Sequence, residues 1–477
     1  MNRIVSIVLV GLTMVACSPN NNHEEKNIPY NVLFIAIDDM NNWVGAMEGK
    51  AKTPNIDRLA GQGMLFSNAH CVVPACNASR VALMTGQRPE TTGQYQNSGN
   101  FRNRPGGIDR VTIAQFLSQQ GYETAAAGKI FHHPRGSGES ADLLSDTASW
   151  DYQWVGNIGT EGRDQYLDEN GFAKWHDGEI DGYLGKFAVW GTTPETKEET
   201  GDWKMSQFCA EFLQQKHDKP FFLAGGIFRP HAPLLAPQKY FDMYPLDAIE
   251  LPEVPEDDMG DIPQIAKENF STPMVKAMRE KGEWKKAVQA YLASMTFADD
   301  CVGNILDALD NSPYKDNTIV VLWSDHGWQL GHKWRWEKFS LWNQGTNAPL
   351  IIKYPGMENP GKEVKQPVSY LSIYPTLLEI LGVENDLPLE GESLMPLMNQ
   401  PDMQWEIPAV VTYPKGSIGV KLDQWNYIKY KDGSEELYDH LVDPREYKNL
   451  ANDEQYASIM AKLSKFIPKG GVPEQAD

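Results

Sequence analysis

Two apolar segments of the sequence each end in residues that could bind a metal ion. Residues 30–37 (YNVLFIAI) and 318–323 (TIVVLW) have the nearly continuous apolar pattern of strands buried on both faces of a parallel sheet. The carboxyl ends of such strands meet at one edge of the sheet, where open α/β proteins bind their ligands. The candidate ligands that directly follow these two segments are Asp38, Asp39, Asp325 and His326.

These side chains predict a site for a hard divalent cation. Three carboxylates held close together repel one another, and a bound cation would remove that repulsion. Oxygen ligands favour Ca²⁺ or Mg²⁺ over softer metals. Each pair alone also fits the ordinary use of aspartate in turns and caps. Their shared position after apolar strands favours the metal site.

The elements that would position this site alternate between strands and helices. Further strands are expected at residues 123–127 and 221–227, and helices are expected from residue 53, over 111–120 and over 285–309. This alternation predicts an α/β fold with a doubly wound sheet. The segment 150–200 is rich in Gly, Asp and Trp, and we expect it to be an insertion near the edge that carries the site.

The pattern of the sequence changes after Gly382, and we expect a smaller subdomain to follow there. Short strands with tight turns are predicted at 408–413, 417–422 and 425–431, followed by a closing helix over 453–466. A chain of 477 residues is long enough for two domains. We therefore expect a catalytic domain over residues 29–385 and a C-terminal α+β subdomain over residues 386–477.

The first 28 residues are typical of an exported lipoprotein. An apolar run over residues 4–16 is too short to be a comfortable membrane span, and it ends in M-V-A-C, which resembles a bacterial lipobox. We expect residues 1–17 to be a lipoprotein signal peptide with Cys17 lipidated, and residues 18–28 to be a polar tether. The protein would then depend on the lipoprotein processing machinery and be anchored to a membrane, in the periplasm or at the cell surface. An ordinary cleaved secretion signal is the alternative.

The composition of the chain argues against a nucleic-acid partner and against a fold held together by disulfide bonds. The formal net charge of −21 argues against a nucleic-acid partner, because no global positive field would attract phosphates. It leaves room for an anionic substrate in a local basic pocket. The four cysteines beyond Cys17 are too scattered to form a disulfide framework.

Two blocks resemble the signatures of the formylglycine-dependent (type I) sulfatases. Residues 74–86 (PACNASRVALMTG) resemble the block in which a cysteine, here Cys76, is oxidised to formylglycine (3-oxoalanine). Residues 121–132 (GYETAAAGKIFH) resemble the second signature. Residues 228–233 (FRPHAP) and 324–331 (SDHGWQLG) are most similar to the iduronate-2-sulfatase and bacterial polysaccharide-sulfatase branch. Together these blocks span nearly all of the expected mature chain.

The resemblance implies an alkaline-phosphatase-like fold and hydrolysis of a sulfate ester on a sulfated carbohydrate. The nucleophile would be a hydroxyl of the hydrated formylglycine, and the reaction would pass through a sulfated enzyme intermediate and release inorganic sulfate. A maturation enzyme that generates formylglycine is an implied partner. Ala78 stands where proline is more usual, which leaves open which maturation enzyme recognises Cys76.

The resemblance also implies roles for individual residues. Arg80 and Lys129 would supply positive charge to the sulfuryl oxygens, and His132 would be the base that expels sulfate from the intermediate. His231 and Lys338 would contact the leaving-group side. Asn77 and Ser79 would orient the turn at Cys76. The implied metal site, for Ca²⁺ or Mg²⁺, consists of Asp38, Asp39, Asp325, His326 and the side chain derived from Cys76.

Other polar and aromatic residues have simpler interpretations. His133 and His332 are expected to be supporting or substrate contacts, and the histidines expected in the core or at the surface are His70, His176, His217 and His440. Trp323 is expected in the core, while at least one of Trp328, Trp334 and Trp336 could line a sugar site. Two alternative functions stay open: a phosphate- or phosphonate-ester hydrolase of the same fold, and a catalytically dead glycan-binding lipoprotein.

Overall fold

The structure is a computed structural model, and it describes residues 29–132, 146–154, 156, 159, 161–176, 180, 182–270 and 273–470. The predicted signal peptide, Cys17 and the polar tether lie outside these residues. Among the described residues, no helix is both long and apolar enough to cross a lipid bilayer. The four described cysteines are all buried and free.

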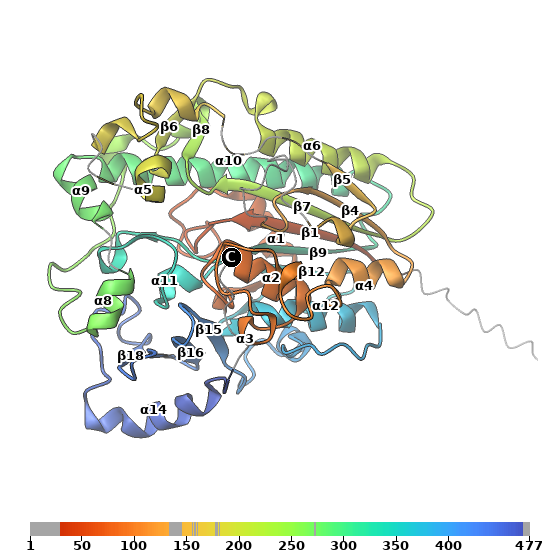
Figure 1. Cartoon of the computed structure of the whole chain (residues 1–477). Helices are drawn as coiled ribbons and strands as arrows, with labels where there is room; N and C mark the ends of the chain where they lie inside the picture. The colour runs from red at the N-terminus through yellow and green to blue at the C-terminus, as the bar shows by residue number, and fades with distance from the viewer. Residues whose placement is uncertain are drawn as a thin grey trace, which may run out of the picture.

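An eight-stranded mixed sheet forms the centre of the molecule, in the order β13-β2-β12-β9-β1-β7-β4-β5 (Figure 1). Its strands are β13 (Glu363–Val364), β2 (Met64–Phe66), β12 (Leu350–Lys353), β9 (Thr318–Ser324), β1 (Asn31–Asp38), β7 (Phe221–Pro230), β4 (Glu123–Gly128) and β5 (Tyr152–Trp154). Strand β12 is antiparallel to both of its neighbours, whereas β9, β1, β7, β4 and β5 all run parallel.

The central strand β1 is buried along its whole length, as its apolar sequence predicts. It pairs in parallel with β9 and with β7, so the carboxyl ends of the three strands lie at one edge. Ile37 lies opposite Ser324, and Asp38 lies opposite Pro230. This register brings the residues after three separate strands to one place, which we call the catalytic edge.

Helices cover both faces of the sheet (Figure 1). On one face the 27-residue helix α10 (Trp284–Asp310) packs with α6 (Gly201–Gln214) and α1 (Pro54–Gln62), and its apolar side chains join one core cluster. On the other face the helices α2 (Cys76–Thr85), α4 (Ile113–Gln119) and α12 (Ile373–Leu381) share a second cluster. The doubly wound α/β arrangement expected from the sequence is confirmed.

The segment 150–200 differs in part from the prediction of an insertion. Strand β5 (Tyr152–Trp154) pairs in parallel with β4 and belongs to the main sheet as its edge strand. The weak periodicity of a partly exposed three-residue strand hid it in the sequence. Further along, β6 (Trp190–Thr193) pairs with β8 (Leu234–Pro237), which follows the block FRPHAP directly. That later part does therefore lie beside the catalytic edge.

A second, antiparallel sheet follows in the chain and lies at one end of the molecule (Figure 1). It is a meander of β15 (Ala409–Thr412), β16 (Ile418–Leu422), β17 (Trp425–Lys429) and β18 (Glu435–Asp439). Helix α14 (Ala457–Leu463) packs on it through Leu463. Three strands and the closing helix were predicted, and β18 was missed because its sequence, EELYD, is mostly acidic. The boundary between residues 385 and 386 stays a prediction.

Glu446 joins this sheet to the main body of the protein through buried hydrogen bonds. Its carboxylate accepts from His440 at 2.9 Å, from Asn426 at 2.6 Å and from the backbone N–H of Asn343 at 2.8 Å. Burial alone would raise the pKa of Glu446, but the bonds and charges of His440 and Lys421 outweigh it and lower the pKa to about 2. The ionised form is therefore strongly favoured in the folded protein.

We predict that Glu446→Gln destabilises the protein by about 3 kcal/mol at pH 7, since each pKa unit corresponds to about 1.4 kcal/mol. A carboxylate whose pKa is lowered on folding contributes stability above its unfolded pKa and loses that contribution as pH falls through its folded value. The difference between wild type and variant should therefore shrink as pH falls from about 4.5 towards 2. Urea unfolding at several pH values measures it, with exposed Glu454→Gln as the control. A difference that is independent of pH would contradict the assignment.

Candidate active site

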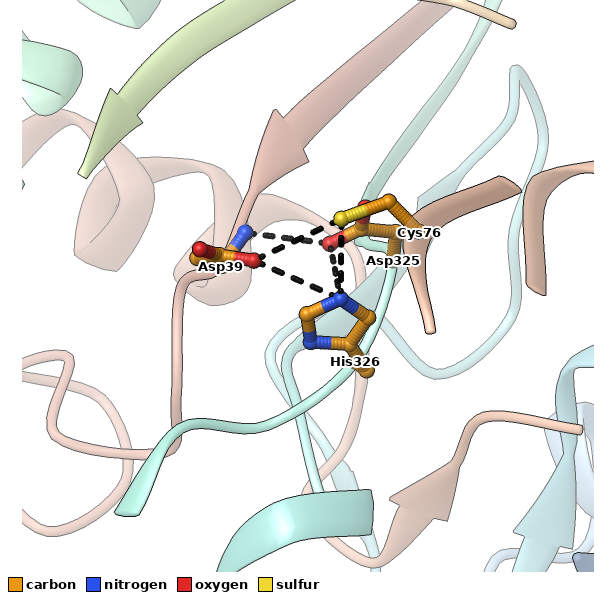
Figure 2. A group of neighbouring side chains, drawn as sticks. All are labelled: Asp39, Cys76, Asp325 and His326. Atoms are coloured by element: carbon orange, nitrogen blue, oxygen red, sulfur yellow. Dashed lines mark hydrogen bonds and ion pairs between the residues drawn. The ribbon is translucent and has the colours of Figure 1, made fainter. Parts of the chain in front are cut away.

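Four predicted side chains converge at the catalytic edge (Figure 2). Candidate ligand atoms of Asp39, Cys76, Asp325 and His326 all lie within 4.8 Å of one another, and all four residues are buried. Asp39 adopts a left-handed backbone conformation with φ of 61°, which is uncommon for a residue other than glycine. Its backbone N–H donates to Asp325 Oδ1 at 3.0 Å, so the turn after β1 is tied to the turn after β9.

Cys76 is the first residue of helix α2 and is fully buried. Its Sγ lies 3.3 Å from His326 Nε2, 3.4 Å from Lys338 Nζ and 3.8 Å from Asp39 Oδ1. Burial raises the pKa of the Cys76 thiol well above its usual range, although Lys129 and Lys338 act in the opposite direction. An unmodified thiol here is protonated at neutral pH and is a weak nucleophile.

Arg80 stands one helical turn after Cys76 and holds two carboxylates at once. Its Nη2 lies 3.0 Å from Asp38 Oδ1 and its Nε lies 2.9 Å from Asp325 Oδ2. Its Nη1 donates to the backbone carbonyls of Lys129 and Ile130. Burial alone would lower the pKa of Arg80, but Asp325 and Asp38 raise it above its usual value. The Arg80 guanidinium therefore stays positively charged and holds the two carboxylates and the two backbone carbonyls in place.

The chain itself supplies counter-charges for the buried aspartates, which the sequence argument did not foresee. Lys129 Nζ bonds Asp38 Oδ2, and Lys338 Nζ lies 2.9 Å from each oxygen of Asp39. With Arg80, three cations face the three carboxylates of Asp38, Asp39 and Asp325. The repulsion invoked from sequence is thus already relieved within the protein, and the case for a metal rests on the ligand geometry instead.

Two histidines present the same ring nitrogen to the site. His326 and His231 each bond a backbone carbonyl through Nδ1, to Gly327 O at 2.9 Å and to Ala232 O at 2.6 Å. In a neutral ring, an Nδ1–H donated to a carbonyl leaves Nε2 without a proton, the usual arrangement of metal-binding and acceptor imidazoles. His326 Nε2 lies 3.3 Å from Asp39 Oδ1, and His231 Nε2 lies 3.7 Å from Asp39 Oδ2.

The residues of this cluster fit a divalent cation. Burial raises the pKa of Asp39 to about 6, with Asp38 and Asp325 adding to the rise and Lys338 opposing it. A cation bound beside Asp39 would restore its ionised form. Asp38 differs, because Arg80 and Lys129 occupy its oxygens, and it groups instead with Cys76 and His231. Its role as a direct ligand stays a prediction.

His132, the last residue of the second signature, lies at the same edge. Burial lowers the pKa of His132 well below its usual value, and the neighbouring charge of Lys129 adds to this. Its Nδ1 is buried without a hydrogen-bond partner. A neutral imidazole with a free nitrogen can accept a proton, which is the role predicted from the sequence. His133 lies outside the described residues.

The supporting residues at Cys76 behave as expected. Asn77 Nδ2 donates to Asn97 O at 3.1 Å and Gly99 O at 2.8 Å, and Ser79 Oγ donates to Asp325 O at 2.5 Å. Both therefore fix the turn, and neither is oriented to react.

The remaining histidines and the tryptophans named from the sequence have structural environments that can be compared with their expected roles. Four histidines each have a hydrogen-bond partner, in the pairs His70–Asn68, His176–Gly185, His217–Glu123 and His440–Glu446. His332 is buried against Trp43. Trp323 is fully buried, as predicted, and Trp328 and Trp336 are buried as well. Trp334 retains partial exposure, so it is the remaining candidate among the four for a sugar contact.

The structure adds two residues that sequence reasoning missed. Tyr291, in the first third of α10, donates its hydroxyl to Asp39 O at 2.7 Å and accepts from Asn41 N at 2.9 Å. Arg335 bonds the backbone of Lys338. In sequence, a tyrosine in an amphipathic helix and an arginine in a tryptophan-rich loop carry no signal of such contacts.

Comparisons with known proteins identify the family. A sequence profile of the sulfatase family matches residues 30–383, and a profile of the N-sulphoglucosamine sulphohydrolase C-terminal region matches residues 331–470. The chain is 38% identical over 473 residues to a sulfatase of Formosa agariphila, covering 97% of this chain and 91% of that protein. It is 28% identical over 456 residues to the iduronate 2-sulfatase of Mus musculus, covering 84% and 80% of the two chains.

Solved structures share the fold. A protein in complex with its substrate D-glucosamine-2-N,6-O-disulfate matches with a TM-score of 0.70 at 22% identity, covering 92% of this chain and 96% of that chain. A phosphonate monoester hydrolase from Silicibacter pomeroyi matches with a TM-score of 0.71 at 21% identity, covering 91% and 94%. At these identities the matches establish the alkaline-phosphatase-like fold alone. Family and activity are shown by the sulfatase profile, which covers most of the chain, and by the 38% identity to the Formosa protein. The chain belongs to the sulfatase family and is a sulfuric ester hydrolase.

Proposed function

We propose that this sulfatase hydrolyses a sulfate ester on a carbohydrate, with Cys76 oxidised to formylglycine and one Ca²⁺ or Mg²⁺ at the catalytic edge. The observation that carries the proposal is the convergence of Asp39, Asp325, His326 and Lys338 on Cys76. Because the thiol of Cys76 is held protonated by burial, oxidation to a hydrated aldehyde would provide the hydroxyl nucleophile that the thiol does not. The cation would supply Lewis-acid stabilisation to a sulfate oxygen and to that hydroxyl.

The charges of the site suit this reaction. The three cations and three carboxylates of the chain balance one another, so the site has no net charge before ligands are counted. A divalent cation would be balanced by the single negative charge of a sulfate ester and that of one ionised hydroxyl. The cation would therefore favour the ionised form of the hydroxyl, and the bound sulfate ester would return the site to neutrality.

The remaining residues have proposed roles that follow from their positions. Lys129 and Lys338 place fixed positive charge where the transferring sulfuryl group gathers negative charge. His132, neutral and with a free nitrogen, accepts a proton in the step that releases sulfate. His231 and Lys338 flank Asp39 on the side assigned to the leaving group, where either can assist a departing alcohol.

A sugar sulfate is proposed in preference to a simple aryl sulfate because of the relatives. Iduronate 2-sulfatase is named for a sugar acid, and the solved neighbour binds a sulfated glucosamine as its substrate. A sugar alkoxide is a poor leaving group that needs protonation, which gives His231 and Lys338 a function. Glycosaminoglycan and algal polysaccharide sugars both satisfy this chemistry.

A screen of defined sulfated oligosaccharides from both sources, scored by released sulfate, tests the proposal. Turnover of at least one sugar sulfate supports it, whereas turnover of aryl sulfates alone would overturn the carbohydrate assignment. Preferred turnover of phosphate or phosphonate esters would favour the first alternative function. An unoxidised Cys76 together with glycan binding and no turnover would favour the second.

We predict one bound Ca²⁺ or Mg²⁺ per chain, measured by elemental analysis of the purified protein. Asp325→Asn is expected to reduce the bound metal, because it removes charge from the oxygen-rich cluster. Asp202→Asn, at a buried aspartate outside the cluster, is the control and should retain the ion. Removal of the ion by a chelator is expected to lower the melting temperature as well as the activity. Zinc or iron as the only active metal would contradict the prediction.

We also propose that the protein is exported and held at a membrane through lipidated Cys17. One diacylated cysteine can hold a protein at a bilayer without a spanning helix. Cys17→Ala is expected to move the protein from the membrane fraction to the soluble periplasm or medium, measured by fractionation and immunoblotting. Cys209→Ala, at a buried cysteine far along the chain, should leave the distribution unchanged. Equal solubility of wild type and Cys17→Ala would exclude the anchor.

A further inference from the structure

The loop over residues 331–339, here called the Lys338 loop, has an unusual backbone. Four of its residues other than glycine have positive φ: 55° at Lys333, 53° at Trp334, 78° at Glu337 and 71° at Phe339. L-residues rarely adopt this conformation, and it persists where surrounding contacts impose it. Two of these residues flank Lys338 directly, so the contacts that hold the loop also determine where the lysine points.

Arg335 makes the contacts that hold the backbone at Lys338. It is 3% exposed, and its Nε and Nη2 donate to Lys338 O at 2.8 and 2.6 Å. Its Nη1 donates to the carbonyl of Phe270, the last residue of α8 (Gln264–Phe270). The carboxylate of Glu337 lies 4.0 Å away, at the limit of an ion pair. The rigid fork of the guanidinium is therefore used on backbone oxygens.

The segment that follows Lys338 is fixed on two sides. Phe339 N donates to Pro74 O at 3.1 Å, two residues before Cys76. Trp342 Nε1 donates to Glu436 in the second sheet at 2.9 Å. Contacts thus hold the chain after the lysine, while Arg335 holds the lysine's own carbonyl. Lys338 Nζ ends 3.4 Å from Cys76 Sγ and 5.2 Å from the centre of the Trp328 ring.

We propose that Arg335 is a positioning residue for the reaction, which places Lys338 Nζ beside Cys76 and Asp39 by gripping the backbone carbonyl of Lys338. The inference rests on the proposed catalytic role of Lys338. Arg335 itself touches none of the reacting groups, so its effect on turnover passes through the lysine. A displacement of about 1 Å in a catalytic group can lower a rate by about 100-fold.

A double-mutant cycle tests the proposal, with 4-nitrophenyl sulfate as substrate and inorganic sulfate as a competing ligand. Arg335→Met is expected to lower kcat by about 100-fold and to weaken inhibition by sulfate in the wild-type background. In the Lys338→Ala background the same substitution should change neither value by more than about twofold, because the group it positions is gone. Arg335→Lys, which keeps the charge but loses the fork, should fall between wild type and Arg335→Met.

The matched control is the double substitution Lys333→Gln/Asp258→Asn, which changes a residue of the same loop and its partner outside the loop. It removes a buried ion pair of 2.9 Å without leaving an unpaired charge, and it does not touch Lys338. It should lower the melting temperature with kcat changed by less than about threefold, since loop stability alone is altered.

Equal losses from Arg335→Met in both backgrounds would overturn the proposal, since Arg335 would then act independently of the lysine. If Arg335→Met does not fold, Arg335→Lys takes its place in the double-mutant cycle, and equal losses in both backgrounds would again overturn the proposal. A Lys338→Ala variant with wild-type activity would instead refute the role proposed for Lys338. A clear loss in Lys338→Ala with full activity in both Arg335 variants would refute the positioning inference alone.

Discussion

Replacing Cys76 by alanine is expected to lower kcat by a factor on the order of 10⁴ or more while leaving the fold intact. The substitution removes the only atom of this residue that faces Asp39, His326 and Lys338, and with it the site of oxidation. Alanine suits the first turn of α2, where Ala78 already stands. The loss should appear with sugar and aryl sulfates alike, because both need the nucleophile.

Mass spectrometry of the peptide that contains Cys76 accompanies this test. The active wild-type protein is expected to carry formylglycine at that position, and Cys71→Ala, at a second buried cysteine nearby in the sequence, should keep both the modification and the activity. Since Cys76 is fully buried in the folded protein, the maturation enzyme would reach it before the site has formed. Full activity in wild-type protein with an unmodified Cys76 thiol would exclude the proposed nucleophile.

The second large effect is expected at His231 and should depend on the substrate. His231→Ala is expected to lower turnover of a sugar sulfate by about 10²- to 10³-fold, the usual contribution of a general acid. Turnover of an activated aryl sulfate should fall by less than about fivefold, because a phenolate leaves without protonation. His217→Gln, at a partly buried histidine paired with Glu123, is the control and should affect neither substrate.

The pH dependence gives the same test an independent readout. Burial lowers the pKa of His231 well below its usual value, and Lys338 and Lys129 lower it further. A histidine that donates a proton must first be protonated, so turnover of sugar sulfates through His231 should keep rising as pH falls well below the usual pKa of a histidine. The rise should be absent in His231→Ala and weak with aryl sulfates. Equal losses on both substrates, with no change in pH profile, would mean that His231 only positions the sulfate.

The catalytic edge could be predicted from sequence because its residues follow elements with strong local signals. The apolar runs before Asp38 and Asp325 are typical of buried parallel strands, and their ends must meet when the strands pair. Helix α10 was predicted within one residue at each end because its apolar periodicity continues over many turns.

Other features depend on contacts between distant parts of the chain. Sequence could not reveal that Arg80, Lys129 and Lys338 pair with the aspartates, because charge pairing is decided by tertiary structure. Strand β18 escaped prediction because it carries a buried glutamate, Glu436. That residue is tolerated because Trp342, Tyr430 and Tyr438 all donate hydrogen bonds to it. The strand propensity of a segment carries no information about hydrogen-bond partners that lie elsewhere in the chain.

The direction of strand β1 has a consequence for how the enzyme would meet a polymer. The strand begins at Asn31 and ends at Asp38, so it separates the entry of the chain from the catalytic edge by about 23 Å. Near that entry, Pro29 O accepts from Asn317 and Tyr30 O accepts from Tyr122, which fasten the first described residues to the rim opposite the active site. The proposed anchor at Cys17 would therefore join the folded domain on the side opposite the active site. Long glycans could then be desulfated from the open side, without having to pass between protein and lipid.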